Sequence, residues 1–485
     1  MVVNSINFWF FFVAVIIPYY VLLRKTWGGQ NMWLLLASYF FYGWIDWKML
    51  PLLLIVTLVF YAIGLSISKF NHKNPKLASR LTTLGVCLGV GVLVYFKYLG
   101  FFIQEFAHFL DAIGLHSNPK TFDIIMPIGI SFFTFKLISY VIEVHREHIE
   151  PSRDIVEFAT YIAFFPTILS GPIDRPNKFI PQLRSARIFD KERILRGGQQ
   201  VLWGIFKKMV IADNLTAIIE NTWQMDSLTG STYLLATLLY TVQMYADFSG
   251  YSDMAIGVGN ILGFDIAVNF KYPFFSRNVS EYWRGWHMSL TSWLTDYIFL
   301  PLNLKFMEYQ KVGLIIAIII NMFLVGIWHG ANWTFAVFGL YHGLLFVPLI
   351  ITGAYNNKKK MITGRFDLPK ARDFLKMIFT FVLVTIGLLI FRADSISDAL
   401  KCFSLIISPS LFSVPRFVGW DNATFIMLIP FIITLFVADW RNRNIACPLF
   451  FKNNHGIKAV ISYTIIVSAI YFLGAESSSF IYFKF

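Results

Sequence analysis

Charged residues are scarce in this chain. They make up 14% of its 485 residues, whereas hydrophobic residues make up 56%. A soluble protein carries roughly 25% charged residues. The longest polar stretches cover only about 20 to 30 residues, too few for a soluble domain that folds alone. The composition therefore excludes an ordinary soluble protein and indicates a membrane protein.

Cysteine and the common metal and nucleotide motifs are also rare or absent. The three cysteines, Cys87, Cys402 and Cys447, have no C-x-x-C spacing and suggest neither a disulfide framework nor a metal site. No HExxH is present, and no histidine pair has ligand spacing within an apolar run, so we expect no metal site. There is no Walker A loop, GxGxxG or GxSxG elbow. We therefore expect no tightly bound cofactor.

Acidic residues are outnumbered by basic ones, 28 to 41, which gives a net charge of +13. The lysines and arginines cluster in short loops between apolar runs, as the positive-inside bias of membrane proteins requires. No basic face with interleaved aromatic residues stands outside these runs. We therefore attribute the surplus to membrane topology and not to nucleic-acid binding.

Long apolar runs, in contrast, are abundant, and many approach the roughly 20 residues that a helix needs to cross a bilayer. They lie near 6–23, 31–45, 50–68, 81–97, 124–143, 156–172, 199–220, 232–262, 313–328, 331–353, 376–391, 424–439 and 458–474. We predict an all-α polytopic membrane protein with about eleven transmembrane helices plus re-entrant segments. No internal repeat is evident, so we predict one integrated domain, 1–485.

The basic loops predict the orientation. Arg24 and Lys25 follow the first run, which no lysine or arginine precedes, and no signal-peptide cleavage site follows it. The first helix then runs from outside to inside. Continued alternation, with Lys458 at the inner end of the last run, places both termini on the extracytoplasmic side.

The run 156–172 breaks this alternation, because basic residues flank it at Arg153 and at Arg175. A re-entrant segment that turns at Ser170-Gly171-Pro172 would resolve the conflict, since glycine and proline disfavour continuing a helix. A short helix along the membrane interface would resolve it equally well. Both alternatives stay open.

A histidine lies between two apolar runs in Gly326-Ile327-Trp328-His329-Gly330-Ala331-Asn332-Trp333. An ionisable side chain is costly in such surroundings and indicates a functional site. The flanking glycines suggest a break in the helix. A neutral imidazole can take a proton from a hydroxyl and later return it. A buried histidine bonded to a backbone carbonyl is the structural alternative, and His342 competes for any catalytic role.

Two further polar clusters occur in apolar sequence. Asp247 and Asp253 lie in the segment 243–253 with Ser249, where they could line a cavity or cap a helix break at Gly250. Arg284 and His287 lie in the segment 282–294 among three tryptophans. Taken alone, that segment is typical of an amphipathic interfacial helix.

These segments together resemble the membrane-bound O-acyltransferases, in the bacterial branch that includes the alginate O-acetylation membrane protein and the teichoic-acid D-alanyl transfer protein. The resemblance covers nearly the whole chain. The matching motifs are Ile128-Gly129-Ile130-Ser131-Phe132-Phe133-Thr134-Phe135, Leu169-Ser170-Gly171-Pro172-Ile173-Asp174-Arg175, 245–253, 282–290, Asp296-Tyr297-Ile298-Phe299-Leu300-Pro301-Leu302, Trp328-His329-Gly330 and 480–485.

The resemblance implies a fold and roles. The family fold is a ring of helices around a thinned central funnel, where a cytoplasmic donor meets an acceptor from the other face. His329 matches the catalytic histidine, the general base, and His287 matches the second family position. The candidate substrate-binding residues are Arg175, Arg284, Trp328, Asn332, Asp247 and Ser249.

The resemblance also implies an activity: transfer of an acetyl group from cytoplasmic acetyl-CoA, the donor substrate, for O-acetylation of an extracytoplasmic polysaccharide. We expect a multi-pass protein of the bacterial cytoplasmic membrane. No serine-hydrolase module is present, so we expect a separate extracytoplasmic acetyltransferase partner of the SGNH type. The alternatives are D-alanyl transfer from a carrier protein to teichoic acid, and a non-enzymatic transporter or flippase, which would also carry broken helices.

Overall fold

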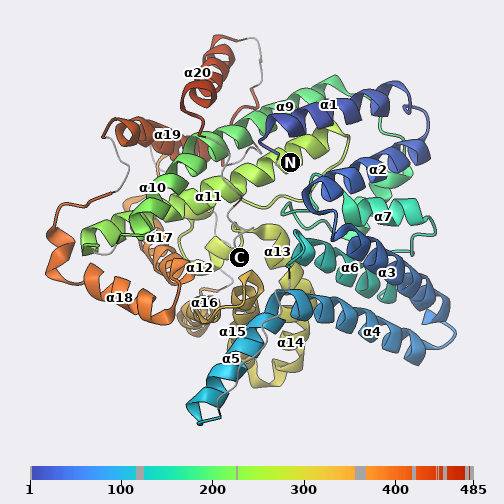
Figure 1. Ribbon diagram of the computed structural model, residues 1–485, viewed down its shortest axis with the longest axis horizontal. Helices are drawn as coiled ribbons and strands as arrows, with labels where there is room; N and C mark the ends of the chain where they lie inside the picture. The colour runs from blue at the N-terminus through green and yellow to red at the C-terminus, as the bar shows by residue number, and fades with distance from the viewer. Residues whose placement is uncertain are drawn as a thin grey trace. The chain divides into compact units, whose positions relative to one another are not determined.

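The computed structural model describes residues 3–115, 125–225, 228–355, 367–417, 422–443, 445, 447–451, 456–475 and 480. Throughout these residues the secondary structure is helical, without a β-strand (Figure 1). The predicted all-α class is confirmed. Residues 481–485 of the C-terminal motif lie outside the described set.

The chain forms two compact units. The first comprises Met1–Val201 and Met254–Ala267, and the second comprises Leu202–Asp253 and Val268–Phe485. Two helices, α9 (Lys191–Ile205) and α11 (Gly230–Ile261), contribute residues to both units. That the whole chain is one integrated domain stays a prediction.

Close helix packing characterises the first unit, where α3, α4 and α6 contact one another and α2 contacts α7. Small residues allow this approach, since an added Cβ at Gly89 would lie 2.6 Å from Ile138. The helices of this unit, besides its part of α9 and α11, are α1 (Ile6–Val21), α2 (Trp27–Asp46), α3 (Leu50–Asn71), α4 (Pro75–Leu93), α5 (Leu99–Ala112), α6 (Ile130–His145), α7 (Ile155–Ala163) and α8 (Pro176–Phe179).

The ambiguous run 156–172 contains one short helix followed by irregular backbone. Helix α7 has 9 residues and ends at Ala163, so it is about 14 Å long, half of the roughly 30 Å hydrocarbon core of a bilayer. The chain then turns, with Phe164, Phe165 and Ile168 fully buried. The run is therefore not a spanning helix, and the re-entrant and interfacial alternatives both remain.

The second unit contains the segment that resembles the family's catalytic region. Its α9 residues continue through the π-helical segment η3 (Phe206–Ala212), which contains Lys207 and Lys208. The other helices are α10 (Asp213–Trp223), most of α11, α12 (Val279–Trp283), α13 (Met288–Leu294), α14 (Leu300–Lys305), α15 (Gln310–His329), α16 (Trp333–Ile351), α17 (Ala371–Arg392), α18 (Ile396–Ile406), α19 (Asn422–Arg441) and α20 (Ile457–Leu473).

Several of the helices have membrane character. Among the described residues, five helical stretches are long and apolar enough to cross a bilayer: Leu50–Asn71, Pro75–Ala112, Met307–His329, Trp333–Ile351 and Ala371–Arg392. Helices α1 and α20 are apolar but shorter. These stretches support a multi-pass membrane protein, and the number of about eleven stays a prediction.

Helices α15 and α16 form a close antiparallel hairpin that carries His329 at its turn. Two glycines permit this packing. An added Cβ would lie 2.2 Å from the Phe335 carbonyl oxygen at Gly326, and 2.4 Å from the Met322 carbonyl oxygen at Gly339. The glycines therefore allow the close packing of the two helices on either side of His329.

Replacing Gly339 by alanine is expected to push α15 and α16 apart, because the methyl group would overlap a backbone carbonyl that cannot rotate away. We expect a loss of about 1–3 kcal/mol in the free energy of unfolding, measured as a lower thermal midpoint in detergent. Gly91→Ala in α4 is the matched control, since a Cβ there meets nothing within 4 Å. An unchanged Gly339→Ala midpoint would contradict this account of the hairpin.

Candidate functional site

His329 is the last residue of α15 and is 5% exposed. The helix ends there because Gly330 continues in extended backbone and Asn332 begins the next helix. The Asn332 side chain accepts a hydrogen bond from the Thr334 backbone N–H at 3.0 Å. The break expected from the flanking glycines is therefore present, and it leaves an imidazole at a buried helix end.

Aromatic rings surround the His329 imidazole. The ring centroids of Trp328 and Phe391 lie 5.0 Å from it, and that of Phe338 lies 6.0 Å away. A cavity of about 10 Å³ adjoins His329 and also touches His342. That volume holds about one water molecule. A larger reactant at this face of the ring would therefore have to displace aromatic side chains.

His287 occupies a strained position between two short helices. Its φ of 45° and ψ of 51° are left-handed, which costs a residue other than glycine roughly 1–2 kcal/mol. Helix α12 ends at Trp283 and α13 begins at Met288, and Trp286 is buried. The alternative of a single amphipathic interfacial helix is therefore wrong. Strained backbone of this kind is concentrated at functional sites.

Trp328 links the two histidines. Its ring centroid lies 5.7 Å from that of His287 and 5.0 Å from that of His329. Phe248 of α11 also packs against His287 in a T-shaped arrangement, with the ring centroids 4.6 Å apart. The structure thus brings His287, Trp328 and His329 together in one buried group, although 41 residues separate Trp328 from His287 in the sequence (328 − 287).

His287 has a polar partner. Its Nδ1 lies 3.2 Å from Oδ1 of Asn269, and the side chain is 1% exposed. His287 also lies outside the five candidate spans. Burial lowers the pKa of its imidazole to about 3, so the ring is neutral near pH 7. A neutral imidazole can accept a hydrogen bond at one nitrogen while it donates at the other.

His342, the competitor for a catalytic role, is held by packing. The Trp283 Nε1–H donates to its Nδ1 at 3.3 Å. On the other side, an added Cβ at Gly387 would lie 2.5 Å from its Nε2, so the ring fills the space that this glycine leaves. These contacts favour a structural role for His342 between α12, α16 and α17.

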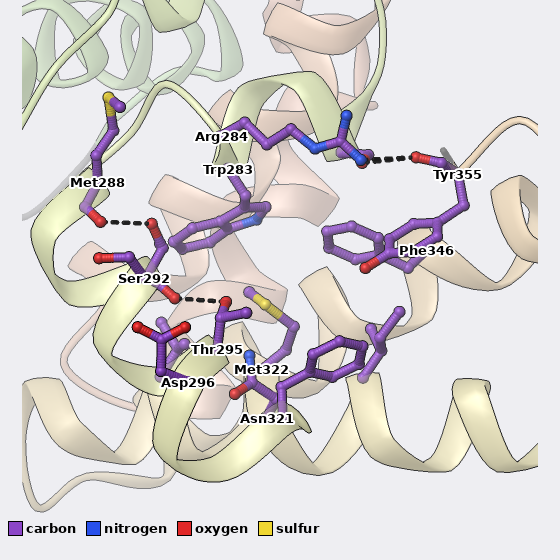
Figure 2. Close-up of a pocket in the computed structure, with 15 residues that line it drawn as sticks. Trp283, Arg284, Met288, Ser292, Thr295, Asp296, Asn321, Met322, Phe346 and Tyr355 are labelled. Carbon is purple, nitrogen blue, oxygen red and sulfur yellow. Dashed lines mark hydrogen bonds between the residues drawn. The ribbon is translucent and has the colours of Figure 1, made fainter. Parts of the chain in front are cut away.

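A pocket of about 370 Å³ opens beside this group. Figure 2 shows Arg284 at one side of it, where the guanidinium donates to the Tyr355 carbonyl oxygen at 3.1 Å. The pocket reaches Met288, next to His287, and Val325, one turn before His329. Its other lining residues are Ser280, Trp283, Thr291, Ser292, Thr295, Asp296, Phe299, Ile318, Asn321, Met322 and Phe346.

Asp247 and Ser249 lie in a buried charged network. Lys208 Nζ lies 2.8 Å from Asp247 and 2.7 Å from Asp213. The neighbouring Lys207 donates to Ser249 Oγ at 2.9 Å. Because α11 runs unbroken from Gly230 to Ile261, the predicted helix break at Gly250 is wrong. These two candidate substrate-binding residues have structural partners, and a substrate role for them stays a prediction.

The remaining candidate substrate-binding residues are Arg175 and Asn332. Arg175 belongs to the first unit, at the residue before α8. Asn332 caps α16 and also donates to the Asp394 carbonyl oxygen at 3.0 Å. Their proposed contacts with substrate stay predictions. In the part of the chain that the structure describes, no group of three histidine, cysteine or acidic residues is arranged to hold a metal ion.

Reasoning from the sequence missed Asn269 and the lysine pair Lys207 and Lys208. The lysines carried a signal, because two charges inside the apolar run 199–220 are as costly as His329. Asn269 carried none, since a single asparagine near a lysine and an aromatic stretch is ordinary loop sequence. Its importance lies in a contact with a residue 18 positions away.

Comparison with known proteins shows which family the chain belongs to. The model of the membrane-bound O-acyltransferase family matches residues 34–361. A probable alginate O-acetylase of Azotobacter vinelandii is 36% identical over 413 residues, 84% of this chain and 78% of its own. A peptidoglycan O-acetyltransferase of Helicobacter pylori is 31% identical over 402 residues, 76% of this chain and 72% of its own.

A third relative is named for the transfer of a D-alanyl group and not of an acetyl group. A teichoic acid D-alanyltransferase of Streptococcus thermophilus is 31% identical over 316 residues, 60% of this chain and 75% of its own. The family match covers more than half of the chain and contains both His287 and His329. The protein is therefore an acyltransferase, and it belongs to the membrane-bound O-acyltransferase family.

Proposed function

We propose that this protein is a membrane O-acetyltransferase that uses cytoplasmic acetyl-CoA for the O-acetylation of an extracytoplasmic polysaccharide. The observation that carries the proposal is the buried group in which Trp328 contacts both His287 and His329. The similarity to an alginate O-acetylase and a peptidoglycan O-acetyltransferase supports acetyl as the group transferred and a polysaccharide as its destination. Membership in an enzyme family argues against the transporter alternative.

In this proposal His329 is the general base. Its imidazole takes the proton of an acceptor hydroxyl while the hydroxyl oxygen bonds to the thioester carbonyl carbon. The carbon–sulfur bond then breaks, and the leaving thiolate takes the proton from the imidazolium. His287 orients the reacting groups from the other side of Trp328. General base catalysis contributes about 10²- to 10⁴-fold to the rate.

The pocket next to Met288 and Val325 is the proposed place for the thioester end of the donor. Its lining includes Met288 and Val325, which are near the two histidines in the sequence, and Arg284, whose guanidinium suits the phosphates of CoA. Arg175 is a further proposed phosphate contact.

Asn321 offers a test of the pocket. It lies within the apolar helix α15, lines the pocket, and its Oδ1 is buried without a hydrogen-bond partner among the described residues. We expect Asn321→Leu to raise KM for acetyl-CoA about three- to tenfold, the effect of one lost hydrogen bond. The apolar exchange Ile318→Leu in the same pocket is the control. Equal KM values for Asn321→Leu and wild type would indicate that acetyl-CoA does not bind in this pocket.

We further propose the membrane arrangement that the family fold implies. About eleven helices would surround a thinned central funnel in the bacterial cytoplasmic membrane, with both termini extracytoplasmic. A separate extracytoplasmic acetyltransferase of the SGNH type would pass the acetyl group to the polymer. Labelling of single cysteines placed at the loop ends, with membrane-impermeant reagents applied from each side, tests this topology.

D-alanyl transfer from a carrier protein is the second candidate. The teichoic acid D-alanyltransferase of Streptococcus thermophilus favours it, although that relative covers 60% of this chain. The two candidates differ in their donor. Purified protein in nanodiscs is given radiolabelled acetyl-CoA, or a D-alanyl-loaded carrier protein, with an extract of surface polymer and membrane partners. Release of CoA with label transfer supports acetylation, and transfer from the carrier alone supports D-alanylation.

A further inference from the structure

Asn269 holds the segment that carries His287. Its backbone carbonyl accepts a hydrogen bond from the Met288 N–H at 2.8 Å, and the Lys271 N–H donates to the Gly285 carbonyl at 2.9 Å. The stretch 269–271 therefore pairs with both flanks of His287. This pairing supports the left-handed conformation that His287 adopts at the start of α13.

The Asn269 side chain is fixed in one orientation. Its Oδ1 lies 3.3 Å from the Ser289 backbone N–H, which can only donate, and it accepts from the Ser289 hydroxyl at 2.6 Å. Its Nδ2 donates to Ser252 Oγ of α11 at 3.1 Å. Exchanging the oxygen and nitrogen would set two N–H groups against each other. Asn269 and Ser252 are both buried.

This orientation determines the tautomer of His287. The atom that faces its Nδ1, at 3.2 Å, is the amide oxygen of Asn269, which accepts hydrogen bonds and donates none. The proton of the neutral imidazole therefore lies on Nδ1, and the lone pair lies on Nε2. A histidine's tautomer is set in this way by the partner of its other nitrogen.

We infer that Asn269 is a positioning residue that fixes His287 in its Nδ1–H tautomer, so that His287 serves the reaction as an acceptor at Nε2. The inference rests on the proposed function and deepens it. A lone pair at Nε2 cannot stabilise an oxyanion, which needs donors. It can accept a hydrogen bond from a second hydroxyl of the acceptor molecule and so aim the reacting hydroxyl. His287 then holds the acceptor molecule, and His329 removes the proton of the reacting hydroxyl.

The tautomer can be measured without any turnover. Nitrogen-15 NMR of protein labelled at histidine separates protonated from unprotonated ring nitrogens, and subtraction of the His287→Ala spectrum isolates His287. We expect a neutral ring with its proton on Nδ1 in wild type, and a shift toward the Nε2–H form in Asn269→Leu. A wild-type His287 with its proton on Nε2 would overturn the inference, whatever the enzyme's substrate.

The positioning role is tested by kinetics. Asn269→Leu should lower kcat about 10- to 100-fold, the usual effect of removing the partner that orients a functional histidine, at an unchanged KM for acetyl-CoA. Asn269→Asp keeps an acceptor opposite Nδ1 and should restore most of kcat. Ser289→Ala is the control, since it removes a hydrogen bond to the same oxygen but leaves the contact with His287.

A double-mutant cycle separates positioning from general destabilisation. In a His287→Gln background, Asn269→Leu should cost no more than about twofold in kcat, because the residue it orients is gone. Additive losses would overturn the inference, as would full activity of Asn269→Leu. If Asn269→Leu does not fold, Asn269→Ala, which also removes the acceptor opposite Nδ1, replaces it in both backgrounds. A wild type that releases no CoA contradicts the proposed function instead, and the NMR result still decides the tautomer.

Discussion

Replacing His329 by alanine is expected to lower acetyl transfer by about 10²- to 10⁴-fold while the protein stays folded. The range is that of a lost general base. His329 is the last residue of α15, so truncating its side chain leaves the backbone hydrogen bonds of that helix intact. CoA release and label transfer are measured side by side for wild type and variant in nanodiscs, with the thermal midpoint as a check on folding.

His342→Gln is the matched control for this loss. Both histidines are buried and touch the same small cavity, but a glutamine at 342 can still accept from Trp283 Nε1. We expect that variant to keep activity within about threefold, since its role is packing. Comparable losses of activity in the two variants would contradict the assignment of His329 as the general base, because the two histidines would then be equally important for the reaction.

The sequence predicted the long apolar helices, because each apolar run is a local signal, whereas α5 (Leu99–Ala112) and α18 (Ile396–Ile406) lie outside the predicted runs. Thirteen apolar runs were expected, and described helices overlap every one of them. His329 was found for the same reason: one ionisable residue in apolar surroundings is visible without any knowledge of its neighbours. The end of the helix at Gly330 was likewise indicated by residues adjacent in the sequence, the glycines on either side of His329.

The errors share a different cause. A helix break at Gly250 was one of the two alternatives for that segment, yet α11 continues through it, and an added Cβ there would lie 2.9 Å from the Gly204 carbonyl oxygen. That glycine serves a close helix contact, which depends on a partner 46 residues away (250 − 204). The roles of Asn269 and Lys208 depend equally on distant partners. Composition and periodicity contain no information about which residues meet across such distances.

Replacing Lys208 by methionine is expected to destabilise the second unit strongly. Lys208 lies between Asp213 and Asp247, at 2.7 and 2.8 Å, and all three side chains are no more than 3% exposed. Without the ammonium, two buried carboxylates would face each other uncompensated. Breaking a buried pair in this way costs about 3–5 kcal/mol. The measurement is the yield of monodisperse protein and its thermal midpoint in detergent.

The matched control is Arg193→Met, which removes an ion pair of the first unit. Arg193 lies 2.6 Å from Asp265, but those side chains are 32% and 80% exposed. Exposed pairs contribute about 0–1 kcal/mol, so this variant should keep nearly the wild-type midpoint. A Lys208→Met midpoint as high as that of Arg193→Met would contradict the buried network.

A rescue variant then separates stability from substrate binding at Asp247. Lys208→Met combined with Asp213→Asn and Asp247→Asn removes the cation and both charges together, and replacing a whole buried ionic group is often close to neutral in stability. We expect the midpoint to return most of the way to wild type. If activity returns with it, Asp247 serves the fold alone. If the protein is stable and inactive, the carboxylate of Asp247 contributes to the reaction as well.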